Sequence, residues 1–112
     1  MRRPWMPLYV GDYLAKTSHL TTIQHGAYCL LIMHYWANEG LPTTDRELMA
    51  IARMTEGEWL SNCHAIAKFF TKDWHHNRVD EELCKAEKTI SARRLAGMKG
   101  ANVRYGRLNG GN

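Results

Sequence analysis

Three short segments of this sequence have the pattern of a capped helix start, and they constrain the fold more than any other feature. In each, a threonine is followed three residues later by Gln or Glu. The segments are residues 21–24, 44–47 and 55–58. In such a capping box the threonine side chain accepts a hydrogen bond from the backbone N–H three residues on, and the Gln or Glu side chain bonds back to the threonine N–H. All three precede apolar residues of helical period, so we expect helices over about residues 22–37, 45–53 and 56–70.

Apolar residues surround most of the first predicted helix. Its circumference is occupied by the apolar residues Ala27, Leu31, Met33 and Trp36 and by His34. One further stripe holds Tyr28, Ile32 and Tyr35. A helix that is apolar all round is normally a buried one. We therefore expect this helix to be buried on more than one side. Gly40 and Pro42 then end it, because Gly suits the position after a helix and Pro cannot continue the hydrogen-bond ladder.

The third predicted helix has an apolar stripe and a contrasting face of small residues. The stripe holds Trp59, Cys63, Ile66, Ala67 and Phe70, and the opposite face includes Ser61, Asn62, Ala65 and Lys68. Asn and Ser can bond base edges, and Lys can meet a phosphate or a guanine. This face is one candidate for DNA contact, and a solvated helix face is an equal alternative. Glu56 and Glu58, at the N-terminus of the helix, place negative charge where a phosphate would otherwise bind.

The segment that follows alternates large and polar residues, as a strand does. Residues 71–73 have the composition of a turn and residues 74–79 alternate, so we expect a short β-hairpin over about 70–79. Together with a helix-turn-helix over about 44–70, this order is typical of a winged helix. The predicted fold class is therefore mainly α with a small β-hairpin (α+β): a winged helix-turn-helix with an extended N-terminal segment and a long C-terminal helix.

The last predicted helix covers about residues 80–96, with acidic residues in its first turn and apolar positions Val79, Leu83, Ala86 and Ile90. Five glycines then punctuate a basic segment that has few apolar residues, which favours a flexible tail over 97–112. We expect one winged-helix domain over residues 1–96 followed by that tail. The apolar positions of the last helix also allow a homodimer through this helix, and packing within the same domain is an equal alternative.

Charge is distributed unevenly along the chain. Residues 1–20 have a net charge of +2, residues 21–84 have −4, and residues 85–112 have +6. The positive residues of the last segment are here called the basic arm: Lys85, Lys88, Arg93, Arg94, Lys99, Arg104 and Arg107. Such a distribution is typical of a protein that meets a polyanion with its ends, although solubility alone can also explain it.

The cysteines and the hydropathy pattern indicate a cytoplasmic protein. Cys29, Cys63 and Cys84 are odd in number and widely spaced, which argues against a disulfide framework and a zinc ribbon. No apolar run approaches the roughly 20 residues of a membrane helix, so we expect no membrane association. Two basic residues open the chain without an apolar signal core behind them.

Several segments resemble the YdaU-like proteins that phages and prophages encode. The matching stretches include residues 4–14 (PWMPLYVGDYL), 25–28 (HGAY), 78–83 (RVDEEL), 96–101 (AGMKGA) and 104–106 (RYG). The resemblance covers most of the chain. It implies a phage-associated protein with a winged-helix-like fold, a region often N-terminal to longer replication-type proteins, and no assigned catalytic residues.

We expect DNA contacts from three places in the chain. They are Ser61, Asn62 and Lys68 on the third helix, Lys72 and Arg78 in the wing, and Arg93, Arg94, Lys99, Arg104 and Arg107 in the basic arm. The arm is the best supported of the three, because cations spread over a helix and glycines can follow a phosphate backbone without reading sequence. A solubilising tail is the alternative for the arm.

The sequence predicts neither an enzyme nor a cofactor-binding protein. No nucleophile elbow, zinc-protease helix or phosphate-binding loop is present. The histidines and cysteines lack metal-ligand spacing, so no metal site is expected.

Two functions of different classes follow from these patterns. The first is a phage or prophage DNA-binding protein, acting on duplex or single-stranded DNA in replication or its regulation. The alternative is a protein-interaction module that binds or inhibits a host or phage replication or transcription protein. The acidic middle of the chain favours the alternative, because it would repel DNA over much of the surface.

Overall fold

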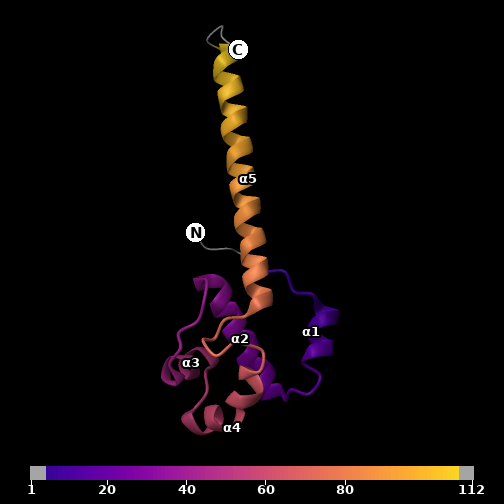
Figure 1. The fold of residues 1–112 in the computed structure, drawn as a ribbon, viewed down its shortest axis with the longest axis vertical. Helices are drawn as coiled ribbons and strands as arrows, with labels where there is room; N and C mark the ends of the chain where they lie inside the picture. The colour runs from indigo at the N-terminus through magenta and orange to yellow at the C-terminus, as the bar shows by residue number, and fades with distance from the viewer. Residues whose placement is uncertain (1–4, 109–112) are drawn as a thin grey trace. The chain divides into compact units, whose positions relative to one another are not determined.

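Every regular element of the described chain is a helix (Figure 1). The computed structural model describes the backbone of residues 5–108 and the side chains of residues 5–97. The helices are α1 (Val10–Lys16), α2 (Thr22–Asn38), α3 (Asp45–Ala52), α4 (Glu56–Ala67) and α5 (Asn77–Leu108). The chain divides into two units, Met1–Glu81 and Glu82–Asn112. The first unit contains α1 to α4 and the first turn of α5, and the second contains the rest of α5.

The three predicted helix starts are confirmed. Thr21 and Thr55 form complete capping boxes with Gln24 and Glu58, in which both reciprocal hydrogen bonds are present. The Thr44 side chain accepts from the backbone N–H of Glu47, so α3 also begins where its sequence pattern predicts. The predicted C-terminal ends of the helices agree less well with the structure. Helix α4 ends at Ala67, three residues before the predicted end at Phe70.

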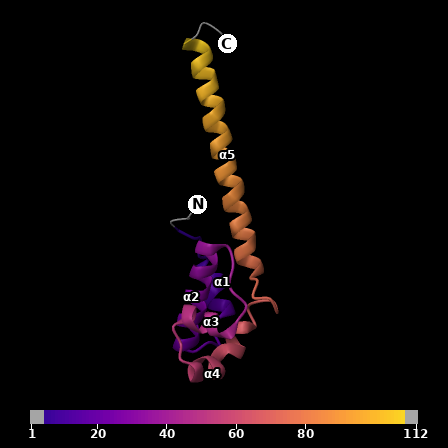
Figure 2. The same ribbon diagram turned by 90° about the vertical axis from the view of Figure 1, so that its left-hand side faces the viewer.

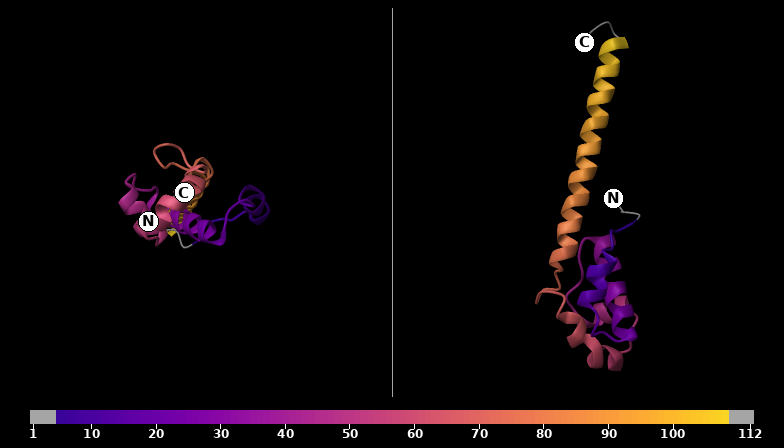
Figure 3. Two further views of the ribbon diagram at one scale, coloured as in Figure 1. Left: turned by 90° about the horizontal axis from the view of Figure 1, so that it is seen from below. Right: turned by 90° about the vertical axis from the view of Figure 1, so that its right-hand side faces the viewer.

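The core of the first unit is built around α2. Helices α3 and α4 pack against it, and α1 lies on the side of α2 away from α3 (Figures 1, 2 and 3). The buried apolar side chains of α2 are Ala27, Tyr28, Leu31, Ile32, Tyr35 and Trp36. Leu48 of α3, Trp59 and Ile66 of α4, and Val79 at the start of α5 are buried with them. The indole N–H of Trp59 donates to the carboxylate of Asp45 at 3.2 Å, which joins α3 to α4.

The predicted β-hairpin is wrong, and the predicted winged helix with it. No residue between 5 and 108 is in a strand. Between α4 and α5 the chain instead makes a compact turn, in which the Thr71 N–H donates to the His75 carbonyl at 2.8 Å and the Trp74 N–H donates to the Thr71 carbonyl at 3.0 Å. Trp74 has a left-handed φ of 61°, which a strand does not allow.

Aromatic packing explains the alternating pattern that predicted the hairpin. The Trp74 ring lies 5.8 Å from the Trp59 ring and 5.2 Å from the Phe70 ring, measured between centroids. The Phe70 ring lies 5.2 Å from the His76 ring. The large residues of this segment are therefore spaced by their contacts with α4 and with one another, and not by the pleat of a sheet.

The two ends of the described chain also differ from expectation. The N-terminal segment was predicted to be extended, but residues 10–16 of it form α1. At the other end, α5 begins at Asn77 and continues to Leu108 through the glycines expected to introduce a flexible tail. Figure 2 shows this uninterrupted helix. Residues 109–112 of the predicted tail lie outside the described residues.

Candidate functional site

Two of the three contact residues predicted for the third helix are exposed, and the third bonds other residues of the protein. Ser61 and Lys68 face solvent. The Asn62 side chain instead accepts a hydrogen bond from the Gln24 side chain at 3.1 Å and donates to the Glu58 carbonyl at 2.8 Å. Asn62 therefore links α4 to α2, and a base contact would require it to give up both bonds.

The N-terminus of α4 is negatively charged. Glu56 and Glu58 occupy its first turn, where a helix otherwise attracts anions such as phosphate. The backbone N–H of Thr55 donates to the Glu58 carboxylate at 2.9 Å. This bond, with a second one from the Thr55 side chain, lowers the pKa of Glu58. Glu58 thus stays ionised and disfavours a phosphate at this helix end.

The residues predicted to form a wing do not form one surface. Lys72 is exposed in the turn after α4. Arg78 instead lies over the Tyr9 ring, with its guanidinium carbon 4.4 Å from the ring centroid, and is 3.8 Å from the Asp12 carboxylate. Because these contacts tie Arg78 to the N-terminal segment and α1, this residue has a structural partner where the sequence suggested a phosphate.

Two tyrosines of α2 form a hydrogen-bonded network with His76 and the first turn of α5. The Tyr28 hydroxyl lies 2.8 Å from Nε2 of His76. The Tyr35 hydroxyl donates to the Asp80 carboxylate, and accepts from the backbone N–H of His76 at 3.3 Å. Burial raises the pKa of Tyr28 to about 12, and burial together with the bond to Asp80 raises the pKa of Tyr35 to about 12. Both hydroxyls therefore stay protonated at neutral pH.

A third tyrosine places α1 against α2. The Tyr13 hydroxyl lies 3.0 Å from Nδ1 of His25 and 3.1 Å from the sulfur of Cys29, and its ring stacks on Tyr28 at a centroid distance of 5.9 Å. Burial, with the contact to Cys29, raises the pKa of the Tyr13 hydroxyl. Sequence reasoning missed these contacts. The seven-residue spacing of Tyr28 and Tyr35 placed both on one stripe of the predicted helix, but it contains no information on Tyr13 or on the partners of these hydroxyls.

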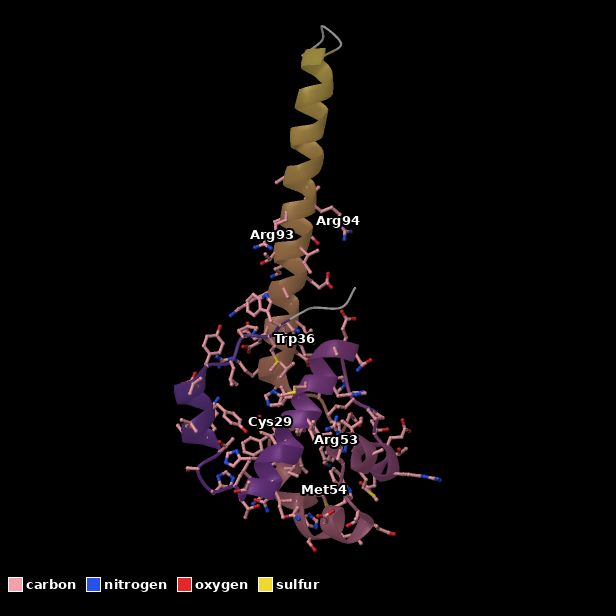
Figure 4. All side chains as sticks on the ribbon, turned by 180° about the vertical axis from the view of Figure 1, so that it is seen from behind. Cys29, Trp36, Arg53, Met54, Arg93 and Arg94 are labelled. Carbon is pink, nitrogen blue, oxygen red and sulfur yellow. The ribbon has the colours of Figure 1, made fainter. Side chains whose placement is uncertain are left out.

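The described residues of the basic arm lie on α5. Lys85, Lys88, Arg93 and Arg94 are exposed, and Arg93 and Arg94 extend from the helix in different directions (Figure 4). Lys85 is 3.5 Å from the Glu82 carboxylate. Among the side chains of residues 5–97, Lys88, Arg93 and Arg94 have no ion-pair partner. Lys99, Arg104 and Arg107 lie on the helical backbone of α5, and their side chains lie outside the described ones.

Two further features bear on what the chain can bind. None of the helices described over residues 5–108 is both long enough and apolar enough to cross a membrane. Over the same part of the chain, no group of three or more His, Cys, Asp or Glu side chains is arranged to hold a metal ion.

Comparison with known proteins identifies relatives for most of the chain. The family model described as "Protein of unknown function (DUF1376)" matches residues 4–84. The uncharacterized protein YdaU of Escherichia coli (strain K12) is 36% identical over 107 residues, which cover 93% of this chain and 37% of that relative. The chain thus spans little more than a third of the relative's length. No solved structure matches the chain.

Proposed function

This chain belongs to the DUF1376 family, as its resemblance to YdaU-like proteins predicted, and we propose that it binds nucleic acid through the phosphate backbone. The contact surface is the basic arm on α5. We propose that this binding serves phage or prophage DNA replication or its regulation in the bacterial cytoplasm.

The observation that carries the proposal is the charge of α5 after Glu82. From residue 85 to the end of the helix the sequence has seven basic residues and one acidic residue, Glu87. The four basic side chains that the structure describes are exposed. Exposed cations on a regular scaffold displace counterions from phosphates and bind without reading bases.

The helical register gathers most of this charge on one side of α5. At 3.6 residues per turn, positions 85, 88, 93, 99, 104 and 107 fall within about 160° of the helix circumference. Positions 87 and 94 fall on the other side. One side of the helix can therefore lie along a phosphate backbone while Glu87 faces away from it.

The first unit is a poor surface for DNA by comparison. The first unit, residues 1–81, has nine acidic and eight basic residues, whereas α5 from residue 85 has one acidic and seven basic residues. Glu56 and Glu58 stand at the start of α4, and Asn62 and Arg78 already have protein partners. These features favour contact with the phosphate backbone through α5 over sequence readout by α4.

A pair of charge-neutralised variants tests the proposal. We expect Lys88→Gln/Arg93→Gln to weaken binding to a labelled DNA duplex in fluorescence polarisation by about tenfold or more, since both residues lie on the basic side of α5. Arg46→Gln, an exposed cation of α3, is the matched control and should bind as the wild type does. Equal affinities for all three proteins, or no binding by the wild type, would refute the proposal.

A second function, binding of a host or phage protein, is favoured by one observation. The N-terminal segment and α1 expose several large apolar side chains to solvent: Trp5 (70% exposed), Leu8 (57%), Val10 (58%) and Leu14 (59%). Exposed apolar clusters beside charged surface are typical of protein interaction sites. A stoichiometric partner that survives nuclease treatment of the lysate, and that a Leu14→Glu variant no longer captures, would support this function.

A further inference from the structure

One face of α2 is apolar and uncovered in the described structure. Ile23 is 55% exposed and Met33 is 60% exposed. Gly26 and Ala37 are also exposed, and Leu30 is half-buried. These five positions, here called the α2 seam, follow one another at spacings of three, four, three and four residues. This is the repeat by which one helix packs against another in a coiled coil.

The composition of α2 is unusual for a helix with an exposed face. Its 17 residues include no Asp, Glu, Lys or Arg, whereas every other described helix has at least one. A surface helix normally places charged or polar residues opposite its buried face. The α2 sequence instead has the all-round apolar pattern of a buried helix, while the first unit leaves the face with Ile23 and Met33 exposed.

Gly26 lies within the seam and leaves room for a second backbone. A glycine in the middle of a helix is unfavourable relative to alanine. A Cβ atom at Gly26 would have no atom of the described residues within 4 Å, so none of these neighbours requires the glycine. A missing Cβ on an exposed helix face allows another backbone to approach closely at that point.

We propose that the α2 seam is a self-association surface, on which α2 of a second copy of this chain packs. Two identical seams place no like charges against each other, and both contribute a small residue at the crossing. A strongly charged partner would find no complementary charge on α2, which favours the second copy as the occupant. Because the seam comprises only five positions of one helix, we expect the dimer to be weak and reversible.

Sedimentation equilibrium of the full chain over a range of concentrations tests this inference. The protein is first treated with nuclease and kept at high salt, so that nucleic acid cannot bridge two copies and the result is independent of the proposed function. We expect the wild type to change from monomer to dimer as the concentration rises. Met33→Glu should raise the dimer Kd by about tenfold or more, because it places like charges in a desolvated contact.

Two controls keep the test specific. Leu60→Glu makes the same kind of change at an exposed residue of α4 (63% exposed) and should leave the dimer Kd unchanged. A mixture of Met33→Glu and Met33→Lys proteins should recover association, since the opposite charges attract. A wild type that stays monomeric at every concentration would overturn the inference. So would a dimer that Ile90→Glu on α5 disrupts while Met33→Glu leaves it intact.

Discussion

The hydroxyl of Tyr28 lies 2.8 Å from Nε2 of His76, and this pair joins the central helix to the residue that precedes α5. The backbone N–H of Val79 donates to the other ring nitrogen, Nδ1, at 3.2 Å. Nδ1 therefore has no proton, and a neutral His76 holds its single ring proton on Nε2, where it donates to Tyr28. The arrangement caps the start of α5 only while His76 is neutral.

This geometry predicts that the first unit is destabilised at acidic pH. Burial lowers the pKa of His76, and Lys16 and Arg78 lower it further, while Asp80 opposes the shift. Between the lowered folded value and the ordinary value of 6.5, the unfolded chain binds more protons than the folded one. The contribution of His76 to the free energy of unfolding is thus full above pH 6.5 and is lost as the pH falls through the folded pKa.

Urea unfolding at about pH 7 and about pH 5 measures this effect. The loss of unfolding free energy on acidification should be smaller in His76→Gln than in the wild type, because glutamine does not titrate. The control His64→Gln changes an exposed histidine of α4. It should lose as much unfolding free energy on acidification as the wild type does. An identical pH dependence in His76→Gln and the wild type would show that His76 does not respond to pH in this way.

Removal of the Tyr35 hydroxyl should also destabilise the first unit. Tyr35 is 1% exposed, and its hydroxyl bonds both the Asp80 carboxylate and the backbone N–H of His76. Tyr35→Phe leaves both groups without this partner and should lower the free energy of unfolding by about 1–3 kcal/mol. We expect a value at the lower end of this range, because the Asp80 side chain is 45% exposed and can form a hydrogen bond to water in place of the lost hydroxyl. The control Ser61→Ala removes an exposed hydroxyl of α4 and should have almost no effect.

Two leucines distinguish the core from the surface of the same unit. Leu31 of α2 is 0% exposed, whereas Leu60 of α4 is 63% exposed. Leu31→Ala should therefore lower the free energy of unfolding by about 2–5 kcal/mol through lost burial and the cavity left behind. Leu60→Ala should change it by less than about 0.5 kcal/mol. Similar effects of both variants on the urea midpoint would contradict the packing described for α2.

Local signals allowed the helix starts to be predicted, and tertiary contacts explain where the prediction failed. Thr21, Thr44 and Thr55 bond residues only three positions away, so the sequence alone contains the relevant information. The Trp74 ring, by contrast, is placed by Trp59, which is fifteen residues earlier in the chain. The alternating pattern of residues 74–79 contains no information about that contact. The pattern alone predicted a β-hairpin.

The same distinction applies to the candidate site. Net charge is a property of the sequence, so the positive arm after residue 84 could be predicted without a structure. The partner of Asn62 is Gln24, 38 residues away, and the structure was needed to find it. The start of α5 was also missed by three residues, because His76 is not among the residues normally expected to cap a helix.

Gly26→Ala should have opposite effects on folding and on self-association. The added Cβ meets no atom within 4 Å and improves helix propensity, so the free energy of unfolding of the monomer should rise by about 0.5–1 kcal/mol. The same Cβ lies in the proposed crossing of two α2 helices and should weaken the dimer. Thermal unfolding at low protein concentration measures the first effect, and sedimentation measures the second. A less stable monomer would contradict the open environment of Gly26.

The salt dependence of DNA binding by the full chain tests the central claim most directly. If about five or six cations of the basic arm neutralise phosphates, the logarithm of the association constant should fall against the logarithm of salt concentration with a slope of roughly −5. Lys88→Gln/Arg93→Gln should reduce the size of that slope by about two, since each lost phosphate contact removes about one. A slope near zero, or a slope unchanged in the double variant, would contradict phosphate binding by α5.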